Sequence, residues 1–336
     1  MTKSDRETFH KAVKLIENAK TVDVFTHLHA DGDAVGSAFG IAYILTDLGK
    51  KVKIFLEEDP GDKFRYLMDP EIECHITGDD VLPYENEKPD LAIVTDCATR
   101  DRVKKRYEIC KRAGKIIKID HHMQDDSFGD VNVVREDWSA VCEGIFLLSK
   151  MLGYDFKKAP HGKKAAIALY TGILTDSGRF GYSNTTSFTH KAASELLKIT
   201  GDMSDTVRNL FSIKPFSKVK IYGIAFSRAE LLCDGKFAFS YVTGDEMKET
   251  GATFQEIDGI SSELCEIEGV ELSALAKPSS KDPKKWGLSL RSYKYCDVAA
   301  IAMKYGGGGH ARAAGFDYEG TTEEIKELLI GELKKY

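Results

Sequence analysis

The stretch Lys115–Asp125, KIIKIDHHMQD, joins an apolar strand-like run to an acid and two adjacent histidines. A second apolar run, Leu91–Thr95 (LAIVT), also leads into an acid, Asp96. Continuous apolar runs of this length are typical of strands that are buried on both faces of a parallel sheet. Because ligands bind beyond the carboxyl ends of parallel strands, these two endings predict a functional edge of the sheet.

The pattern around these runs predicts an α/β fold. Strand-like runs alternate with helix-like stretches, as in a parallel sheet with crossover helices. Thr21–Thr26 and Lys51–Leu56 are two further β-rich runs, and apolar residues at helical spacing predict a helix from Asp33 to Leu48. We therefore predict a parallel-sheet catalytic domain with flanking helices over residues 1–195.

A second domain is expected because 336 residues exceed the usual size of one domain. From Lys236 onward come further β-rich runs, then a glycine cluster, and a charged helix, Thr322–Lys335, closes the chain. We predict a linker over 196–215 and a smaller, substrate-binding α/β domain over 216–336, with a cleft between the two domains.

Composition narrows the class of protein. The chain is 42% hydrophobic and 30% charged, with no apolar run near the roughly 18 residues that a membrane span needs. Its seven cysteines are scattered and form no C-x-x-C pair, which favours a reducing cytoplasmic location. The net charge of −6 argues against coating long nucleic acid, but it leaves room for a short phosphorylated substrate.

Acids and histidines follow four separate segments of the first domain. Each has an ordinary explanation when taken alone: Asp33 as a helix N-cap, for example, or Asp31 as part of a turn. Together, so many acids without a cation would repel one another strongly. Divalent metals such as Mn²⁺, Co²⁺, Fe²⁺ or Zn²⁺ accept carboxylate and imidazole ligands and would resolve this. The candidates are His27, Asp31, Asp33, Asp96, Asp120, His121, His122 and Asp176.

These segments resemble a known family. HLHADGD from His27, then Asp96, then DHH from Asp120, then Thr175-Asp176 match, in order, the four motifs of the DHH phosphoesterase superfamily. Gly306–Gly315 (GGGGHARAAG) and the SLRS that ends at Ser292 resemble its associated C-terminal domain. The length looks most like the stand-alone nano-RNase (oligoribonuclease) and pAp phosphatase group.

The resemblance implies a metal-dependent hydrolase. Its substrates would be short oligoribonucleotides (nano-RNA, pApA), the 3′-phosphate of pAp, or both, cleaved by water that two metals activate. A cyclic di-AMP phosphodiesterase and an exopolyphosphatase-like hydrolase are alternatives within the enzyme class. A nucleotide-binding regulatory protein is the alternative outside it. Every position at which the family has a metal-ligating residue carries such a residue here, which favours an enzyme over a regulatory protein. The choice among substrates stays open.

The resemblance also implies roles for single residues. His27 and Asp31 would hold one metal, Asp33, His121 and Asp176 the other, and Asp96 would bridge both. His122 would face the scissile phosphate or the leaving oxygen. Asp120 would orient a histidine. Mn²⁺ is the favoured metal, with Co²⁺, Fe²⁺ or Mg²⁺ as alternatives.

Candidate substrate contacts lie mainly in the second domain. From Lys277 to Arg312 there are eight basic residues and two acidic ones, a local balance of +6. A solvated basic face is the ordinary explanation, but arginine forks and glycine-rich backbone also bind phosphate. Arg100 could reach a phosphate or form a surface salt bridge, and the chain could form a homodimer. The candidates are Arg100, Arg291, Ser292, Gly307, Gly308, Gly309, His310 and Arg312.

Overall fold

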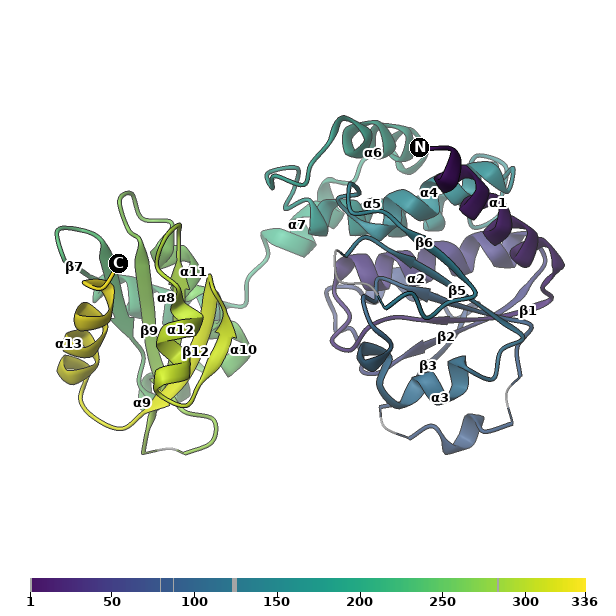
Figure 1. Ribbon diagram of the computed structural model, residues 1–336. Helices are drawn as coiled ribbons and strands as arrows, with labels where there is room; N and C mark the ends of the chain where they lie inside the picture. The colour runs from purple at the N-terminus through teal and green to yellow at the C-terminus, as the bar shows by residue number, and fades with distance from the viewer. Residues whose placement is uncertain (1, 79, 87, 123–125, 283) are drawn as a thin grey trace. The chain divides into compact units, whose positions relative to one another are not determined.

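The computed structural model describes residues 2–78, 80–86, 88–122, 126–282 and 284–336. The chain divides into two compact units, Met1–Ser212 and Ile213–Tyr336, each with its own sheet (Figure 1). The last three residues of the stretch Lys115–Asp125 lie outside the described residues. Within the described part of the chain, no helix is long and apolar enough to cross a membrane.

The first unit contains the predicted parallel sheet. Among the described residues, the strand order is β3-β2-β1-β4-β5-β6. Successive strands of the chain are added outward from the β1/β4 pair, first on the β1 side and then on the β4 side. The chain therefore reverses its direction of winding between β1 and β4. Open α/β sheets bind their ligands at such a point. The strands are β1 (Thr21–Phe25), β2 (Lys51–Leu56), β3 (Glu73–Ile76), β4 (Leu91–Thr95), β5 (Lys115–Asp120) and β6 (Val131–Val134).

Helices cover the two faces of this sheet unequally. The longer helices pack on one face, over the main hydrophobic core, and the short α3 lies on the other (Figure 1). The predicted α/β fold of this domain is confirmed. The helices are α1 (Lys3–Asn18), α2 (Gly32–Asp47), α3 (Tyr107–Cys110), α4 (Val141–Met151), α5 (Gly162–Asp176), α6 (Ser187–Thr200) and α7 (Ser204–Phe211), with short 3₁₀ turns η1 (Arg65–Leu67), η2 (Leu82–Tyr84) and η3 (Arg100–Arg106).

Glycines let α2 and α5 approach closely. A Cβ atom on Gly36 would lie 2.5 Å from the carbonyl oxygen of Ala168, and one on Gly172 would lie 2.5 Å from Oδ1 of Asp33. Such distances are far below van der Waals contact, so only glycine fits at these two positions. The close packing brings the start of α2, with Asp33, against the end of α5.

The segment 196–215, predicted as a linker, carries the last turn of α6 and all of α7. Met203 and Leu210 are buried, and the boundary between the two units falls after Ser212. Most of this segment therefore belongs to the first unit. Its helix α7 has an apolar side, and sequence periodicity alone could not show what that side packs against.

The second unit is a mixed sheet in the order β11-β12-β10-β9-β8-β7 among the described residues. Strands β8 and β9 pair in parallel and the other neighbours are antiparallel. The strands are β7 (Glu230–Leu232), β8 (Phe237–Tyr241), β9 (Leu272–Pro278), β10 (Trp286–Ser292), β11 (Gly308–His310) and β12 (Ala313–Tyr318); the helices are α8 (Phe216–Ser227), α9 (Gly244–Thr250), α10 (Phe254–Ile257), α11 (Ile260–Cys265), α12 (Val298–Lys304) and α13 (Thr322–Leu333). A smaller α/β domain was predicted here, and the sheet agrees with it.

Candidate metal centre

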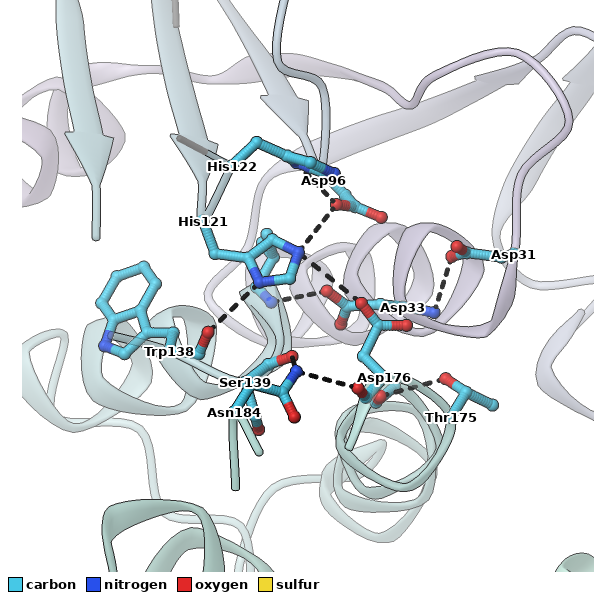
Figure 2. Close-up of polar contacts among 12 residues, drawn as sticks. Asp31, Asp33, Asp96, His121, His122, Trp138, Ser139, Thr175, Asp176 and Asn184 are labelled. Atoms are coloured by element: carbon cyan, nitrogen blue, oxygen red, sulfur yellow. Dashed lines mark hydrogen bonds and ion pairs between the residues drawn. The ribbon is translucent and has the colours of Figure 1, made fainter. Parts of the chain in front are cut away.

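Asp31 and Asp33 are fixed by the ends of two different helices. Asp31 is the N-cap of α2, and its Oδ1 accepts hydrogen bonds from the backbone N–H groups of Asp33 and Ala34, both at 3.1 Å. Asp33 is fully buried and accepts from the N–H groups of Val141 at 2.5 Å and Cys142 at 3.1 Å, at the start of α4 (Figure 2). Asp33 therefore caps a helix, but the helix is α4 rather than its own.

Asp96 is a buried carboxylate that has no hydrogen-bond donor among the described residues. It follows β4, is 1% exposed, and has a φ of 54°, in the left-handed region that few residues other than glycine adopt. Neither carboxylate oxygen accepts a hydrogen bond from any described residue. Leaving such a group unsatisfied is costly, and a bound cation would satisfy both oxygens.

The imidazoles of His27 and His121 face Asp96 through the same ring atom. Nδ1 of His27 lies 2.5 Å from the Leu28 carbonyl oxygen, and Nδ1 of His121 lies 3.2 Å from the Trp138 carbonyl oxygen. Since a carbonyl only accepts, Nδ1 carries the hydrogen in both rings and Nε2 is left for a metal. The two Nε2 atoms lie 3.4 Å and 3.5 Å from the Asp96 oxygens.

The structure brings the candidate ligands into three overlapping groups, within each of which the ligand atoms lie within 4.8 Å of one another. Asp96 and His121 each belong to two groups. All six residues predicted as metal ligands are included, and His122 is present as well. The groups are His27, Asp31 and Asp96; Asp33, His121 and Asp176; and Asp96, His121 and His122. This donor set fits divalent metals.

Crowding of charge shifts the titration of these groups. Burial, with repulsion from Asp33, raises the pKa of Asp176 to about 9. Burial and the charge of Asp96 raise the pKa of Asp33 to about 7. Burial opposes protonation of His27 and His121, but the neighbouring carboxylates outweigh it and raise the pKa of each to about 10. Without a cation, the centre therefore holds protons in its place.

His122 differs from His121 in its partner and in its exposure. Its Nδ1 lies 2.8 Å from Oδ1 of Asp120, and its side chain is 37% exposed against 13% for His121. The other oxygen of Asp120 lies 3.3 Å from Nζ of Lys118, and both of these side chains are fully buried. Asp120 thus lies within hydrogen-bond distance of His122, and a buried lysine balances its charge.

Several supporting contacts were not predicted. Asn184 donates through Nδ2 to the carbonyl oxygens of Asp176 at 3.0 Å and Ser139 at 3.3 Å, which ties the end of α5 to the segment before α4 (Figure 2). The partners of Asn184 and of the Nδ1 atoms of His27 and His121 are backbone carbonyls, which carry no sequence signal. Lys118 did carry one, since it is a charged residue inside an apolar strand.

One candidate substrate contact in the first unit, Arg100, has a structural partner. Nε of Arg100 lies 3.1 Å from Oδ2 of Asp126, which is the salt bridge named above as its alternative role.

In the second unit, two arginines lie at the carboxyl end of β10. Arg291 donates through Nε to Oγ of Ser262 at 3.1 Å and through Nη1 to the carbonyl oxygen of Leu290 at 2.9 Å. Arg312 donates through Nη1 to Oγ of Ser292 at 3.1 Å and to the carbonyl oxygen of Cys296 at 2.8 Å. These contacts orient both guanidinium groups without pairing either one with a carboxylate.

The glycine cluster forms strand β11 and its approach rather than a loop. Gly309 has a φ of 143°, and its Cβ would lie 2.5 Å from the Ala313 carbonyl oxygen; a Cβ on Gly307 would lie 2.2 Å from the Gly315 carbonyl oxygen. Backbone packing thus explains Gly307 and Gly309. A Cβ on Gly308 would meet no described atom within 4 Å, and Gly308 and His310 are exposed.

The raised carboxyl pKa values predict that metal binding releases protons. Asp176 titrates near 3.8 in an unfolded chain but near 9 in the folded metal-free protein. Its contribution to stability is therefore present at low pH and is lost as the pH rises toward 9. We expect Mn²⁺ to displace this proton, so that its affinity and its gain in melting temperature increase from about pH 6 to 9.

Titration calorimetry in two buffers of different ionisation enthalpy measures this release. We expect at least one proton per chain at pH 7, and fewer for Asp176→Asn. Identical heats in the two buffers, with an affinity that does not change with pH, would show that these carboxyl groups do not bind the metal.

Comparisons with known proteins agree with this geometry. Residues 21–173 match the family model described as "DHH family, N-terminal domain", and residues 234–335 match the "DHHA1 domain". The chain is 30% identical to the "Probable bifunctional oligoribonuclease and PAP phosphatase NrnA" of Streptococcus mutans serotype c, over 96% of this chain and 99% of that protein. It is 29% identical to the "Bifunctional oligoribonuclease and PAP phosphatase NrnA" of Bacillus subtilis, over 90% and 91% of the two chains.

A solved structure has the same fold. An exopolyphosphatase-related protein from Bacteroides fragilis superposes with a TM-score of 0.83 at 24% identity, over 100% of this chain and 98% of that chain. At this identity the likeness concerns the fold alone. It confirms the predicted combination of a parallel-sheet domain with a smaller α/β domain.

Proposed function

Because the chain belongs to the DHH family, we propose that it cleaves short oligoribonucleotides and removes the 3′-phosphate of pAp with two bound Mn²⁺ ions. It is a phosphoesterase of the oligoribonuclease and pAp phosphatase type. Its relatives named for both activities are similar over 90% or more of both chains. The two activities are compatible, since each breaks a phosphoester bond of a small ribonucleotide.

One observation carries the metal-dependent chemistry. Both oxygens of buried Asp96 lie between imidazole Nε2 atoms and accept no hydrogen bond from the described residues. We propose that His27 and Asp31 hold one cation, that Asp33, His121 and Asp176 hold the other, and that Asp96 holds both. When bound, such a pair supplies an activated water and neutralises the charge that develops on the phosphoryl group. The mixed oxygen and nitrogen donors favour Mn²⁺ over Mg²⁺.

The protein's own groups act around that pair. With Nδ1 of His122 held by Asp120, Nε2 of the same ring is free to donate to a phosphoryl oxygen or to the leaving oxygen. Lys118 keeps Asp120 in place by balancing its charge. In the second unit, we propose that Arg291, Arg312 and His310 bind the remainder of the nucleotide, with exposed Gly308 allowing close approach of the ligand.

The second unit also has a basic cavity beside the glycines. It has a volume of about 650 Å³ and is lined by Lys277, Lys281, Lys285 and Gly306–Gly308. Lys277 pairs with Asp258 at 2.8 Å. A phosphate-binding role for this unit suits a chain whose overall charge is negative, because the basic residues gather locally.

We further propose that the enzyme is cytoplasmic and homodimeric.

A parallel assay tests the function. Purified protein with Mn²⁺ is given pAp, oligoribonucleotides of two to five residues, cyclic di-AMP, pyrophosphate and long single strands, each with a chelator control. We expect turnover of pAp and of the short strands that chelator stops and Mn²⁺ restores. We expect strands of about twenty nucleotides to react on the order of tenfold more slowly, as the net negative charge disfavours long polyanions.

Hydrolysis of none of these substrates would point to a nucleotide-binding regulatory protein. Cleavage of cyclic di-AMP in preference to the linear substrates would instead point to a cyclic dinucleotide phosphodiesterase.

A further inference from the structure

The loop that follows β10, Tyr293–Cys296, is held by a single buried residue. Glu271 is 3% exposed, and its carbonyl oxygen accepts the N–H of Tyr293 at 2.9 Å. Its carboxylate accepts the next three N–H groups, those of Lys294 at 3.1 Å, Tyr295 at 2.7 Å and Cys296 at 2.7 Å. Four successive backbone groups thus bond to one residue, which makes this tyrosine loop rigid.

The tyrosine loop presents two aromatic rings to solvent. Tyr293 is 74% exposed and Tyr295 is 49% exposed. Both line a cavity of about 580 Å³ together with Lys236 and Lys294. Rigid aromatic side chains lose little conformational freedom on binding, so they are efficient contacts for a flat ligand.

Basic residues lie next to these rings, and the acidic residues Glu266 and Glu271 also line the cavity. Arg312 contacts the loop directly, through the 2.8 Å hydrogen bond to the carbonyl oxygen of Cys296. Ser292, which joins Arg291 to the loop, donates its N–H to the Arg312 carbonyl oxygen at 3.2 Å. Lys294 lies between the two tyrosines in sequence, is exposed, and lines the same cavity. Aromatic faces beside arginine and lysine form the arrangement that binds unpaired nucleotides.

We propose that the tyrosine loop is a nucleobase subsite, in which Tyr293 and Tyr295 stack on one base of the oligoribonucleotide while Lys294, Arg291 and Arg312 pair with its phosphates. The inference rests on the proposed function, because it assigns the base contact of the same substrate. Stacking uses the face of a base and not its edge, so the subsite accepts any sequence. It favours substrates with a base at the bound position over those without one.

Kinetics on matched dinucleotides test the subsite. The substrates are an adenine dinucleotide and the same backbone lacking one base or the other. We expect Tyr293→Ala/Tyr295→Ala to raise KM for the dinucleotide on the order of 10- to 100-fold while kcat changes less than about twofold. The double variant should no longer distinguish the dinucleotide from one of the two abasic analogues. Tyr293→Phe and Tyr295→Phe, which keep the ring, should match the wild type.

Two controls separate the subsite from general effects. Tyr336→Ala removes another exposed tyrosine of the second unit, and we expect it to leave KM unchanged. In chelator, a 2-aminopurine dinucleotide reports stacking without turnover, and we expect quenching with the wild type but not with the double alanine variant.

The outcomes distinguish this inference from the proposed function. If the wild type hydrolyses short RNA but the alanine variants keep its KM, or if the phenylalanine variants are as impaired as the alanine variants, the subsite is overturned and the function stands. If the wild type quenches 2-aminopurine without hydrolysing anything, the subsite stands and the function fails.

Discussion

Asp96→Ala is expected to abolish hydrolysis, with a loss on the order of 10³-fold or more. Asp96 is the carboxylate that both proposed metals share, so its removal loosens two cations at once. A loss of that size corresponds to about 4 kcal/mol of transition-state stabilisation, which is within what a metal pair supplies. The same change should lower the metal content after dialysis from two ions per chain to one or none.

Asp96→Asn is a second variant, which separates the loss of the charge from an effect on the fold. Asparagine tolerates the left-handed backbone at this position better than alanine does, so the fold is kept while the charge is lost. Metal analysis and kinetics are compared with Asp101→Ala, an exposed acid a few residues further along the chain, for which we expect normal values. Full metal occupancy with a near-normal rate in Asp96→Asn would refute the assignment of Asp96.

His122→Ala is expected to keep the metals but to lower kcat on the order of 10²- to 10³-fold, as loss of a general acid does. The structural reason is the contrast within the histidine pair. His121 places Nε2 between Asp96 and Asp176, whereas His122 is held by Asp120 and is more exposed. KM should change little, because the proposed contact matters mainly in the transition state.

Two measurements, metal content and the dependence of the rate on the leaving group, distinguish His122 as a general acid from His122 as a metal ligand. A nucleotide p-nitrophenyl ester has a leaving group that needs no proton, so it should react nearly as fast with His122→Ala as with the wild type. His29→Ala serves as the matched control, since His29 is largely exposed and pairs with Glu58. Loss of a metal ion in His122→Ala would instead make His122 a ligand, as its grouping with Asp96 and His121 allows.

The fold was predictable from local patterns. Continuous apolar runs marked β4 and β5, β-rich runs marked β1 and β2, and helical spacing marked α2, because burial leaves a direct trace in the order of residues. The same patterns did not reveal that 196–215 packs mostly within the first unit. Its helix α7 is short, and its apolar residues Val207 and Phe211 pack against the main core of the first unit.

The candidate ligands were also predictable, since they end strands that a parallel sheet aligns at one edge. The sequence could not show how they are held. Asp33 caps α4 across more than a hundred residues, the ring orientations of His27 and His121 depend on backbone carbonyls, and Glu271 organises a loop more than twenty residues away.

The sequence by itself therefore determined which elements form and which acids and histidines are available at their ends. Only the tertiary structure decided which nitrogen of each histidine faces Asp96, how Lys118 and Asp120 distinguish His122 from His121, and which tyrosines stand beside the arginines. The physical reason is that periodicity records burial along the chain. Hydrogen bonds to carbonyls and close helix packing join distant segments through groups that every residue has, and so leave no mark on residue identity.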